Sequence, residues 1–106
     1  MALTKDSEKA FKIIYCEYKH RRKSGFTKAD SIQFEDGSIS KLKCFSDWLR
    51  PDIESAIEEL VSSGYLKEDI LGNISITNNG ISYMENKPKD FFNDLSNLFD
   101  LASIFL

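Results

Sequence analysis

Apolar residues recur at helical spacing in two segments of the chain. In the first, from about Lys5 to Lys23, Thr4 or Ser7 is available to cap the start, and the apolar face consists of Ala10, Phe11, Ile13, Ile14, Tyr15 and Tyr18. In the second, Pro51 stands where a first helical turn tolerates proline and Gly64 supplies a stop, and the apolar face consists of Ile53, Ala56, Ile57, Leu60 and Val61. Each pattern predicts a helix.

The segment between these helices mixes two periodicities. Ile32 and Phe34 alternate with polar residues before Asp36-Gly37, a dipeptide that favours a tight hairpin turn. Ser38 then offers a cap to a helical face that contains Ile39, Leu42, Phe45, Trp48 and Leu49. We predict a short extended piece at residues 31–35 and a helix at about residues 39–48.

Two short strands and a further helix are predicted after Gly64. The strands flank Leu71-Gly72-Asn73, a turn sequence whose Gly and Asn adopt a positive φ most easily. Thr77 is placed to cap the helix, which ends near Lys87-Pro88. We expect Gly80 to let helices pack closely, and we expect core positions at Tyr65, Leu66, Ile74 and Ile76.

Length and composition indicate one compact domain with one appended element. A chain of 106 residues, 42% of them hydrophobic and 29% charged, is long enough for one core and is not disordered overall. No apolar run approaches the roughly 20 residues needed to cross a bilayer, and no secretory signal is present, so we expect a cytoplasmic protein with no membrane contact. Cys16 and Cys44 lack a CxxC partner, and we expect reduced, buried thiols.

The net charge of −3 hides an uneven distribution along the chain. Residues 1–50 carry 11 Lys or Arg and 7 Asp or Glu, a balance of +4, whereas residues 51–106 carry 3 and 10, a balance of −7. A polyanion would be attracted to the first part and repelled by the second, provided that the charges also separate in space.

The predicted order of helix, helix, helix, two-stranded ribbon and helix resembles the winged helix-turn-helix superfamily. The local match covers residues 56–86: in the family, a helix ending in L…GY(L/I) precedes a strand, a Gly-containing wing tip and a second strand closing in (L/I)T..G...(L/M). The matching positions here are Leu60, Gly64, Tyr65, Leu66, Gly72, Ile76, Thr77, Gly80 and Met84. The small size and the amphipathic C-terminal segment also resemble the YjcQ-like winged-helix proteins of Gram-positive bacteria and their prophages.

The resemblance implies a mainly α fold with a small β-hairpin, in the α+β class. We assign residues 1–87 to the winged-helix domain and residues 88–106 to an amphipathic helix. Such a helix must bury its apolar face on the domain, on a second copy or on a partner. We expect it to form a homodimer together with the first helix, through Phe91, Phe92, Leu95, Leu98, Phe99, Ala102 and Phe105.

The resemblance also implies a transcription regulator whose third helix enters the major groove of double-stranded DNA. The outer face of that helix departs from this pattern, because it carries four acids that repel a polyanion, namely Asp52, Glu54, Glu58 and Glu59. Arg50 and Ser55 remain as attractive contacts there. The other candidate nucleic-acid contacts are Lys19, Arg21, Arg22, Lys23, Lys41 and Lys43, unless the run at the end of the first helix only complements the helix dipole.

Two functions therefore stay open. The first is a non-enzymatic DNA-binding regulator, which we favour slightly because this use is frequent in the superfamily. The second is a protein-interaction module of phage or mobile-element type, whose acids bind a basic protein surface or mimic nucleic acid. His20 is the only histidine, and no phosphate loop, nucleophile elbow or paired-histidine motif appears. We expect no enzyme activity, no cofactor and no metal.

Overall fold

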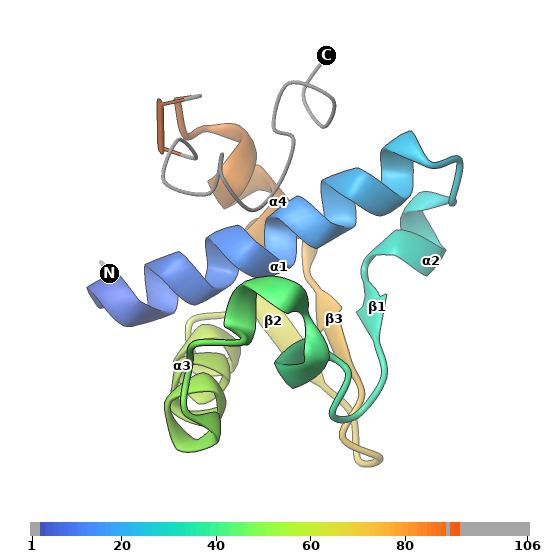
Figure 1. Ribbon diagram of the computed structural model, residues 1–106. Helices are drawn as coiled ribbons and strands as arrows, with labels where there is room; N and C mark the ends of the chain where they lie inside the picture. The colour runs from blue at the N-terminus through green and yellow to red at the C-terminus, as the bar shows by residue number, and fades with distance from the viewer. Residues whose placement is uncertain (1–2, 89, 92–106) are drawn as a thin grey trace.

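The computed structural model describes residues 3–88 and 90–91 and is mainly helical, with one small antiparallel sheet (Figure 1). This arrangement confirms the α+β class. In chain order, the elements are α1 (Lys5–Lys23), α2 (Lys28–Ser31), β1 (Gln33–Phe34), the 3-10 turns η1 (Ile39–Lys41) and η2 (Lys43–Phe45), α3 (Arg50–Ser62), β2 (Leu66–Glu68), β3 (Ile74–Ile76) and α4 (Asn78–Glu85).

Helix α1 crosses the middle of the molecule, with α4 on one side and α3 and the sheet on the other (Figure 1). Its start is capped as predicted, because the Thr4 hydroxyl accepts a hydrogen bond from the Ser7 amide. Its apolar face forms the centre of the core, where Ala10, Phe11, Ile14 and Cys16 are fully buried. The first predicted helix is therefore confirmed over its whole length.

The sheet has the strand order β1-β3-β2, and β3 pairs antiparallel with both neighbours. The register places Phe34 on one side of Ile74 and Glu68 on the other. Residues directly opposite each other in antiparallel strands point to the same face, so Glu68 shares the face of the buried Phe34 and Ile74. The two strands predicted around the turn are confirmed, and Gly72 has a φ of +88°.

The segment before α3 differs from its prediction. The α-helix expected at residues 39–48 is wrong, because Leu42 has an extended backbone and separates the chain into η1 and η2. Ile39, Cys44 and Phe45 are all buried. On a regular helix, positions five residues apart would point about 140° away from each other. Breaking the helix lets both turns bury their apolar side chains in the same core.

The hairpin turn that Asp36-Gly37 favours does not form. Strand β1 pairs with β3 rather than with the residues that follow it, and Gly37 turns the chain into η1. The Ser38 hydroxyl donates to the Glu35 carbonyl and caps no helix. Helix α2, capped by the Thr27 hydroxyl, was not predicted and takes up the start of the extended piece expected at residues 31–35.

Helix α4 is seated closely on the rest of the protein. The Thr77 hydroxyl accepts from the Gly80 amide, as predicted, and donates to the Gly64 carbonyl. A Cβ atom at Gly80 would overlap the Tyr65 carbonyl oxygen and lie 3.0 Å from Phe11 Cζ, which confirms the close packing expected there. Tyr65 itself is only half-buried, whereas the other predicted core residues are buried, namely Leu66, Ile74 and Ile76.

Cys16 and Cys44 are both buried, as expected, and no disulfide joins them. Phe91 packs against the core, and the ammonium groups of Lys12 and Lys87 lie 4.2 and 5.0 Å from the centre of its ring. The remaining residues of the expected dimer contact lie outside the described residues, namely Phe92, Leu95, Leu98, Phe99, Ala102 and Phe105. The homodimer therefore stays a prediction.

Candidate functional site between α3 and the hairpin

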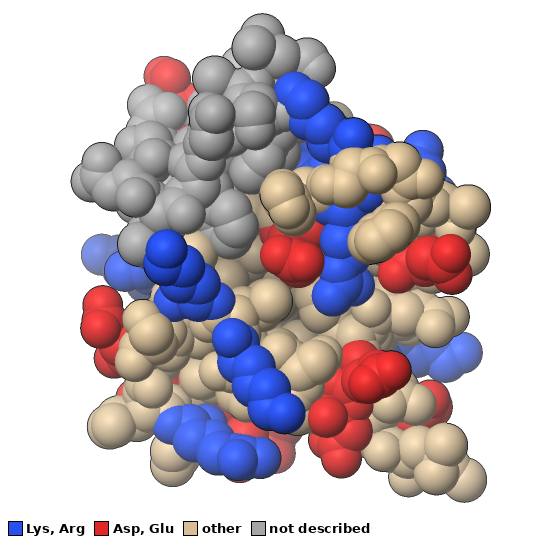
Figure 2. Space-filling model, turned by 45° about the vertical axis from the view of Figure 1, so that its right-hand side comes forward, with Lys and Arg blue, Asp and Glu red and all other residues tan. Residues whose placement is uncertain are grey.

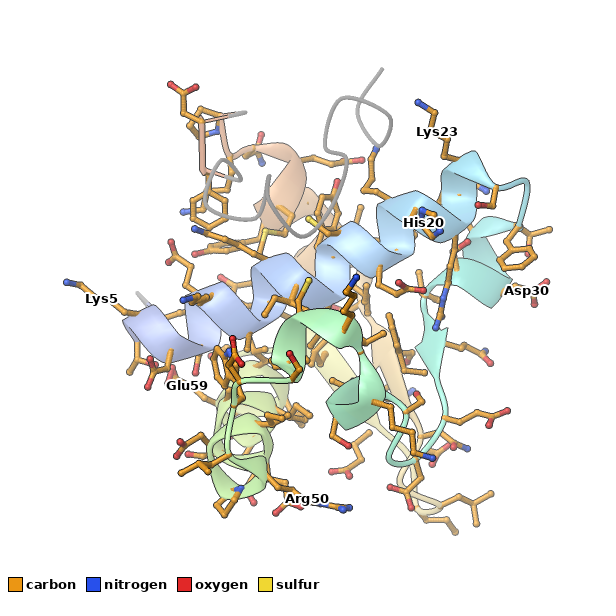
Figure 3. The ribbon with its side chains drawn as sticks, viewed as in Figure 1. Lys5, His20, Lys23, Asp30, Arg50 and Glu59 are labelled. Carbon is orange, nitrogen blue, oxygen red and sulfur yellow. The ribbon has the colours of Figure 1, made fainter. Side chains whose placement is uncertain are left out.

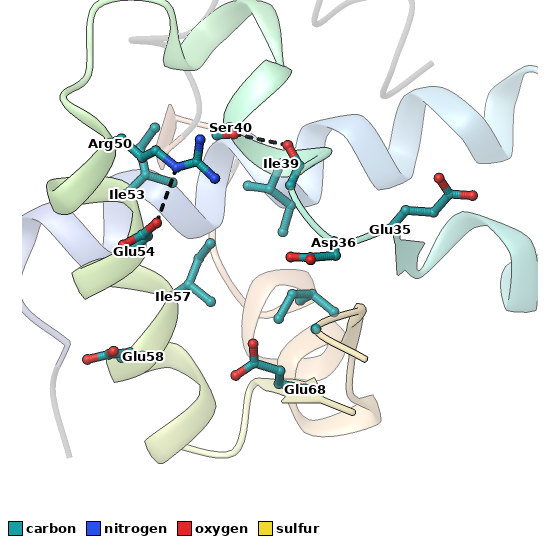
Figure 4. Close-up of a pocket in the computed structure, with 13 residues that line it drawn as sticks. Glu35, Asp36, Ile39, Ser40, Arg50, Ile53, Glu54, Ile57, Glu58 and Glu68 are labelled. Atoms are coloured by element: carbon teal, nitrogen blue, oxygen red, sulfur yellow. Dashed lines mark hydrogen bonds and ion pairs between the residues drawn. The ribbon is translucent and has the colours of Figure 1, made fainter. Parts of the chain in front are cut away.

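A hollow of about 240 Å³ lies between α3, the β2–β3 hairpin and the segment that leads from β1 into η1 (Figure 4). Several elements form it together, and its first and last lining residues, Glu35 and Ile74, are more than 30 positions apart in the sequence. We call it the α3–hairpin hollow and define it by its lining: Glu35, Asp36, Gly37, Ile39, Ser40, Arg50, Ile53, Glu54, Ile57, Glu58, Glu68, Gly72 and Ile74.

Four isoleucines give the hollow an apolar floor. Ile53 and Ile57 stand one helical turn apart on α3 and therefore share one face of that helix. Ile39 from η1 and Ile74 from β3 complete the floor. Three of the four are buried, and Ile57 is half-buried. The same side chains that hold α3 on the core thus expose an apolar edge to the hollow.

Carboxylates surround this floor. The lining includes five acids, namely Glu35, Asp36, Glu54, Glu58 and Glu68. In Figure 4, Asp36 and Glu68 point into the space between α3 and the hairpin, whereas Glu35 and Glu58 extend away from it. The sheet register explains Glu68, which shares the core-facing side of the sheet with Ile74. Glu68 makes no ion pair within the described part of the chain.

Arg50 is the one cation among the lining residues. Its Nε lies 3.2 Å from Glu54 Oε1, one helical turn further along α3 (Figure 4). The two side chains remain 72% and 63% exposed. An exposed ion pair of this kind contributes only about 0–1 kcal/mol. Arg50 was predicted to contact DNA, and in the structure its guanidinium is directed to a neighbouring carboxylate.

The wall opposite α3 is fixed by contacts between the hairpin turn and Asp36. The Asp36 amide donates to Asn73 Oδ1 over 3.1 Å, and a Cβ at Gly72 would lie only 2.8 Å from Asp36 Cγ. Asp69 organises the turn itself, because its carboxylate accepts from the amides of Leu71 and Asn73. These hydrogen bonds, with the Asn73 amide contributing most, lower the pKa of Asp69 below its usual value.

The acids of α3 do not all have the same environment. Asp52, Glu54 and Glu58 are exposed, as is Ser55. Glu59 is half-buried, and its carboxylate accepts from the amide and the hydroxyl of Thr4 over 3.0 Å (Figure 3). The Thr4 amide is the main reason that the pKa of Glu59 lies below its usual value. Glu59 therefore fastens the start of α1 to α3.

Arg21 is held inside the fold rather than free at the end of α1. Its guanidinium pairs with Glu17 over 3.1 Å, donates to the Gln33 carbonyl over 2.6 Å and lies 4.2 Å from the centre of the Phe34 ring. It also reaches the Ser31 carbonyl. One side chain thus connects α1, the end of α2 and β1, a role that its position in a cationic run did not reveal.

The predicted cations at the end of α1 do not share a surface with Arg50. Figure 3 places Lys23 and His20 at the C-terminal end of α1 and Arg50 at the opposite edge of the molecule. Arg22 donates to the Phe26 carbonyl, and Lys19 is half-buried. Lys41 and Lys43 are exposed on η1 and η2. On the face shown in Figure 2, acidic side chains lie between and beside the basic ones.

The sequence-based prediction of site residues did not include two exposed apolar residues at the hairpin turn. Ile70 is 99% exposed and Leu71 is 73% exposed, directly beside the wall of the α3–hairpin hollow. Adjacent apolar residues inside a predicted turn are the signal that would have indicated them. Exposed apolar side chains next to a hollow are typical of contact surfaces.

No protein-family model, curated protein or solved structure matches this chain in the comparisons. Within residues 3–88 and 90–91, no helix is both long and apolar enough to span a membrane. The same residues contain no cluster of three or more His, Cys, Asp or Glu side chains suited to a metal ion.

Proposed function

We propose that this chain is a winged-helix module that binds a basic segment of another protein through α3 and the α3–hairpin hollow, without catalysing a reaction. The observation that carries the proposal is the lining of that hollow, where carboxylates from three separate elements surround an apolar floor. A basic segment with apolar residues complements both properties.

The winged-helix assignment is supported by topology. Strand β1 comes after α1 and the short α2, α3 leads directly into the β2–β3 hairpin, and the sheet order is β1-β3-β2. That order brings the early strand beside the second strand of the hairpin, as in a winged helix. The departure lies in the second helix, whose place is taken by η1 and η2.

Electrostatics argue against α3 as a reader of DNA. Asp52, Glu54 and Glu58 are exposed on it, and the cation of Arg50 is paired with Glu54. A carboxylate about 4 Å from a phosphate is repelled by about 1 kcal/mol even in bulk water. Ser55 alone cannot offset several such repulsions. The same charges attract a cationic polypeptide.

A second candidate is DNA binding through the cations outside α3. The observation in its favour is the exposure of Lys23, Lys41 and Lys43. Such binding would depend on phosphate contacts and would weaken steeply with salt. It would also leave α3 outside the contact, in contrast to the usual winged-helix arrangement.

Fluorescence anisotropy separates the two candidates. A labelled peptide of alternating arginine and leucine and a labelled DNA duplex are each titrated at about 20 mM salt, where screening extends over about 20 Å, and at about 150 mM salt. We expect peptide binding that is weakened by the double variant Asp52→Asn and Glu58→Gln. The matched control is Asp30→Asn with Glu85→Gln, which removes the same charge from α2 and α4.

Two results would count against the proposal. If the peptide fails to bind at low salt, α3 is not a surface for basic segments. If the duplex binds at low salt and Lys41→Gln with Lys43→Gln abolishes that binding, the DNA candidate replaces it.

A further inference from the structure

The α3–hairpin hollow already has a guanidinium at its edge. Arg50 belongs to its lining and pairs with Glu54, while Asp36 and Glu68 point into the space beyond (Figure 4). The pair between Arg50 and Glu54 shows that a carboxylate of this hollow can bind a guanidinium. The ion pair of Arg50 is with Glu54, its neighbour on α3, and not with Asp36 or Glu68.

We infer that the α3–hairpin hollow is a side-chain pocket for one arginine of the partner, and that Arg50 competes with this arginine in the free protein. The inference rests on the proposed function and adds the residue that is recognised and the group that opposes it. The methylene stem of the arginine lies on the isoleucine floor, and its guanidinium meets Glu68 and Asp36.

The size of the hollow supports a single side chain. Pockets for small molecules and cofactors usually measure about 300–1,000 Å³, and this hollow measures about 240 Å³. An arginine suits it better than a lysine, because the planar guanidinium donates to two carboxylates at once. Asp36, which follows β1, and Glu68, on β2, reach the hollow from two different parts of the chain.

The hairpin turn adds a second contact. Ile70 and Leu71 are exposed beside the wall of the hollow and offer an apolar surface to the residue that follows the arginine. The recognised segment therefore combines an arginine with an adjacent apolar residue. Its charge also complements the exposed acids of α3, namely Asp52, Glu54 and Glu58.

Arg50 is expected to weaken this binding, although it contributes little to the stability of the fold. Its pair with Glu54 is mostly exposed and therefore weak. Its positive charge lies at the edge of the hollow and repels an incoming guanidinium. Replacing it removes this competitor while the floor stays in place, because Ile53 and Ile57 are held by the core.

The test uses the full chain with its isoleucine δ1 methyl groups labelled for NMR and a pentapeptide of alternating leucine and arginine as the probe. The control peptide has citrulline in place of arginine, which keeps the shape and removes the charge. We expect shifts at the floor methyls of Ile39, Ile53, Ile57 and Ile74. The core methyls of Ile13, Ile14 and Ile81 serve as internal references.

The variants define the pocket. We expect Glu68→Gln to weaken binding about three- to tenfold, as loss of a charged hydrogen bond would. Glu85→Gln, which removes an exposed acid from α4, is expected to leave it unchanged. Arg50→Gln is expected to tighten binding about two- to fivefold, whereas Lys67→Gln, the same charge change on the other face of the sheet, tightens it less.

Each outcome has a definite consequence. Binding that shifts the floor methyls and is lost with citrulline supports the pocket. If the peptide binds but only Asp52→Asn and Glu58→Gln weaken it, with the floor methyls unmoved, the pocket is overturned and the proposed function stands. If Arg50→Gln tightens binding no more than Lys67→Gln, Arg50 is not a competitor. If the peptide does not bind at low salt, the proposed function itself fails.

Discussion

Replacing Gly80 by alanine tests how closely α4 is held against the rest of the protein. The added methyl group would overlap the Tyr65 carbonyl oxygen and approach Phe11 Cζ to 3.0 Å. The carbonyl is not free to turn away, because it accepts a hydrogen bond from the Thr77 amide while the Tyr65 amide donates to the Leu60 carbonyl. The start of α4 must therefore move outward.

Opposing contributions set the size of the effect. Alanine is favoured over glycine inside a helix by up to about 1 kcal/mol. Overpacking a tight site costs about 1–3 kcal/mol, and loss of the hydrogen bond between Thr77 and Tyr65 costs about 1 kcal/mol more. We expect the free energy of unfolding to fall by about 2 kcal/mol and the melting midpoint by roughly 10 °C.

Urea unfolding followed by circular dichroism measures this change, provided that the slope of the transition stays the same. Ser82→Ala is the control, since it changes an exposed side chain of the same helix and should alter stability by less than about 0.5 kcal/mol. If Gly80→Ala is as stable as the unchanged protein, the close approach imposes no constraint and the reasoning is refuted.

Two further predictions concern the contacts that fasten helix ends. The depressed pKa of Glu59 means that its stabilising contribution is present above the usual carboxyl pKa and is lost as pH falls through the lowered value. Glu59→Gln should therefore lower the urea midpoint at pH 7 and leave it unchanged at about pH 2. An equal decrease at both pH values would contradict a stabilising role for the hydrogen bonds from Thr4 to the Glu59 carboxylate. Thr77→Val removes both the cap of α4 and the bond to the Gly64 carbonyl, so the free energy of unfolding should fall by about 1–2 kcal/mol. Thr27→Val removes the cap of α2, which has only four residues, so it should lower the melting temperature less than Thr77→Val does. A larger drop in melting temperature for Thr27→Val would contradict this expectation.

Elements whose signals are local were predicted from the sequence. The apolar stripes of α1 and α3, the caps at Thr4 and Thr77 and the turn at Gly72 all depend on residues within a few positions of one another. The segment at residues 39–48 was not predicted correctly, because its conformation is decided by burial. Its apolar spacing also fits a helix, and only the position of the core shows that Ile39 and Phe45 must reach the same side.

The site was predictable only in part for a similar reason. The sequence indicated exposed acids on α3, but the α3–hairpin hollow also needs Asp36 and Glu68, which the sheet order brings to it. The internal role of Arg21 and the bond from Thr4 to Glu59 join residues 12 and 55 positions apart. Charge counted along the chain cannot show which of these groups are already engaged.

The contact between Asp36 and Gly72 has a consequence for natural variation. The carboxylate occupies the space that a side chain at position 72 would need. A larger residue there would displace the segment after β1 and widen the α3–hairpin hollow. Because Gly72 also has a φ of +88°, which disfavours a side chain, homologous chains that keep this turn should keep glycine at position 72 even where a smaller residue replaces Asp36. Homologues that keep both Asp36 and Gly72 are the ones expected to keep the width of the α3–hairpin hollow.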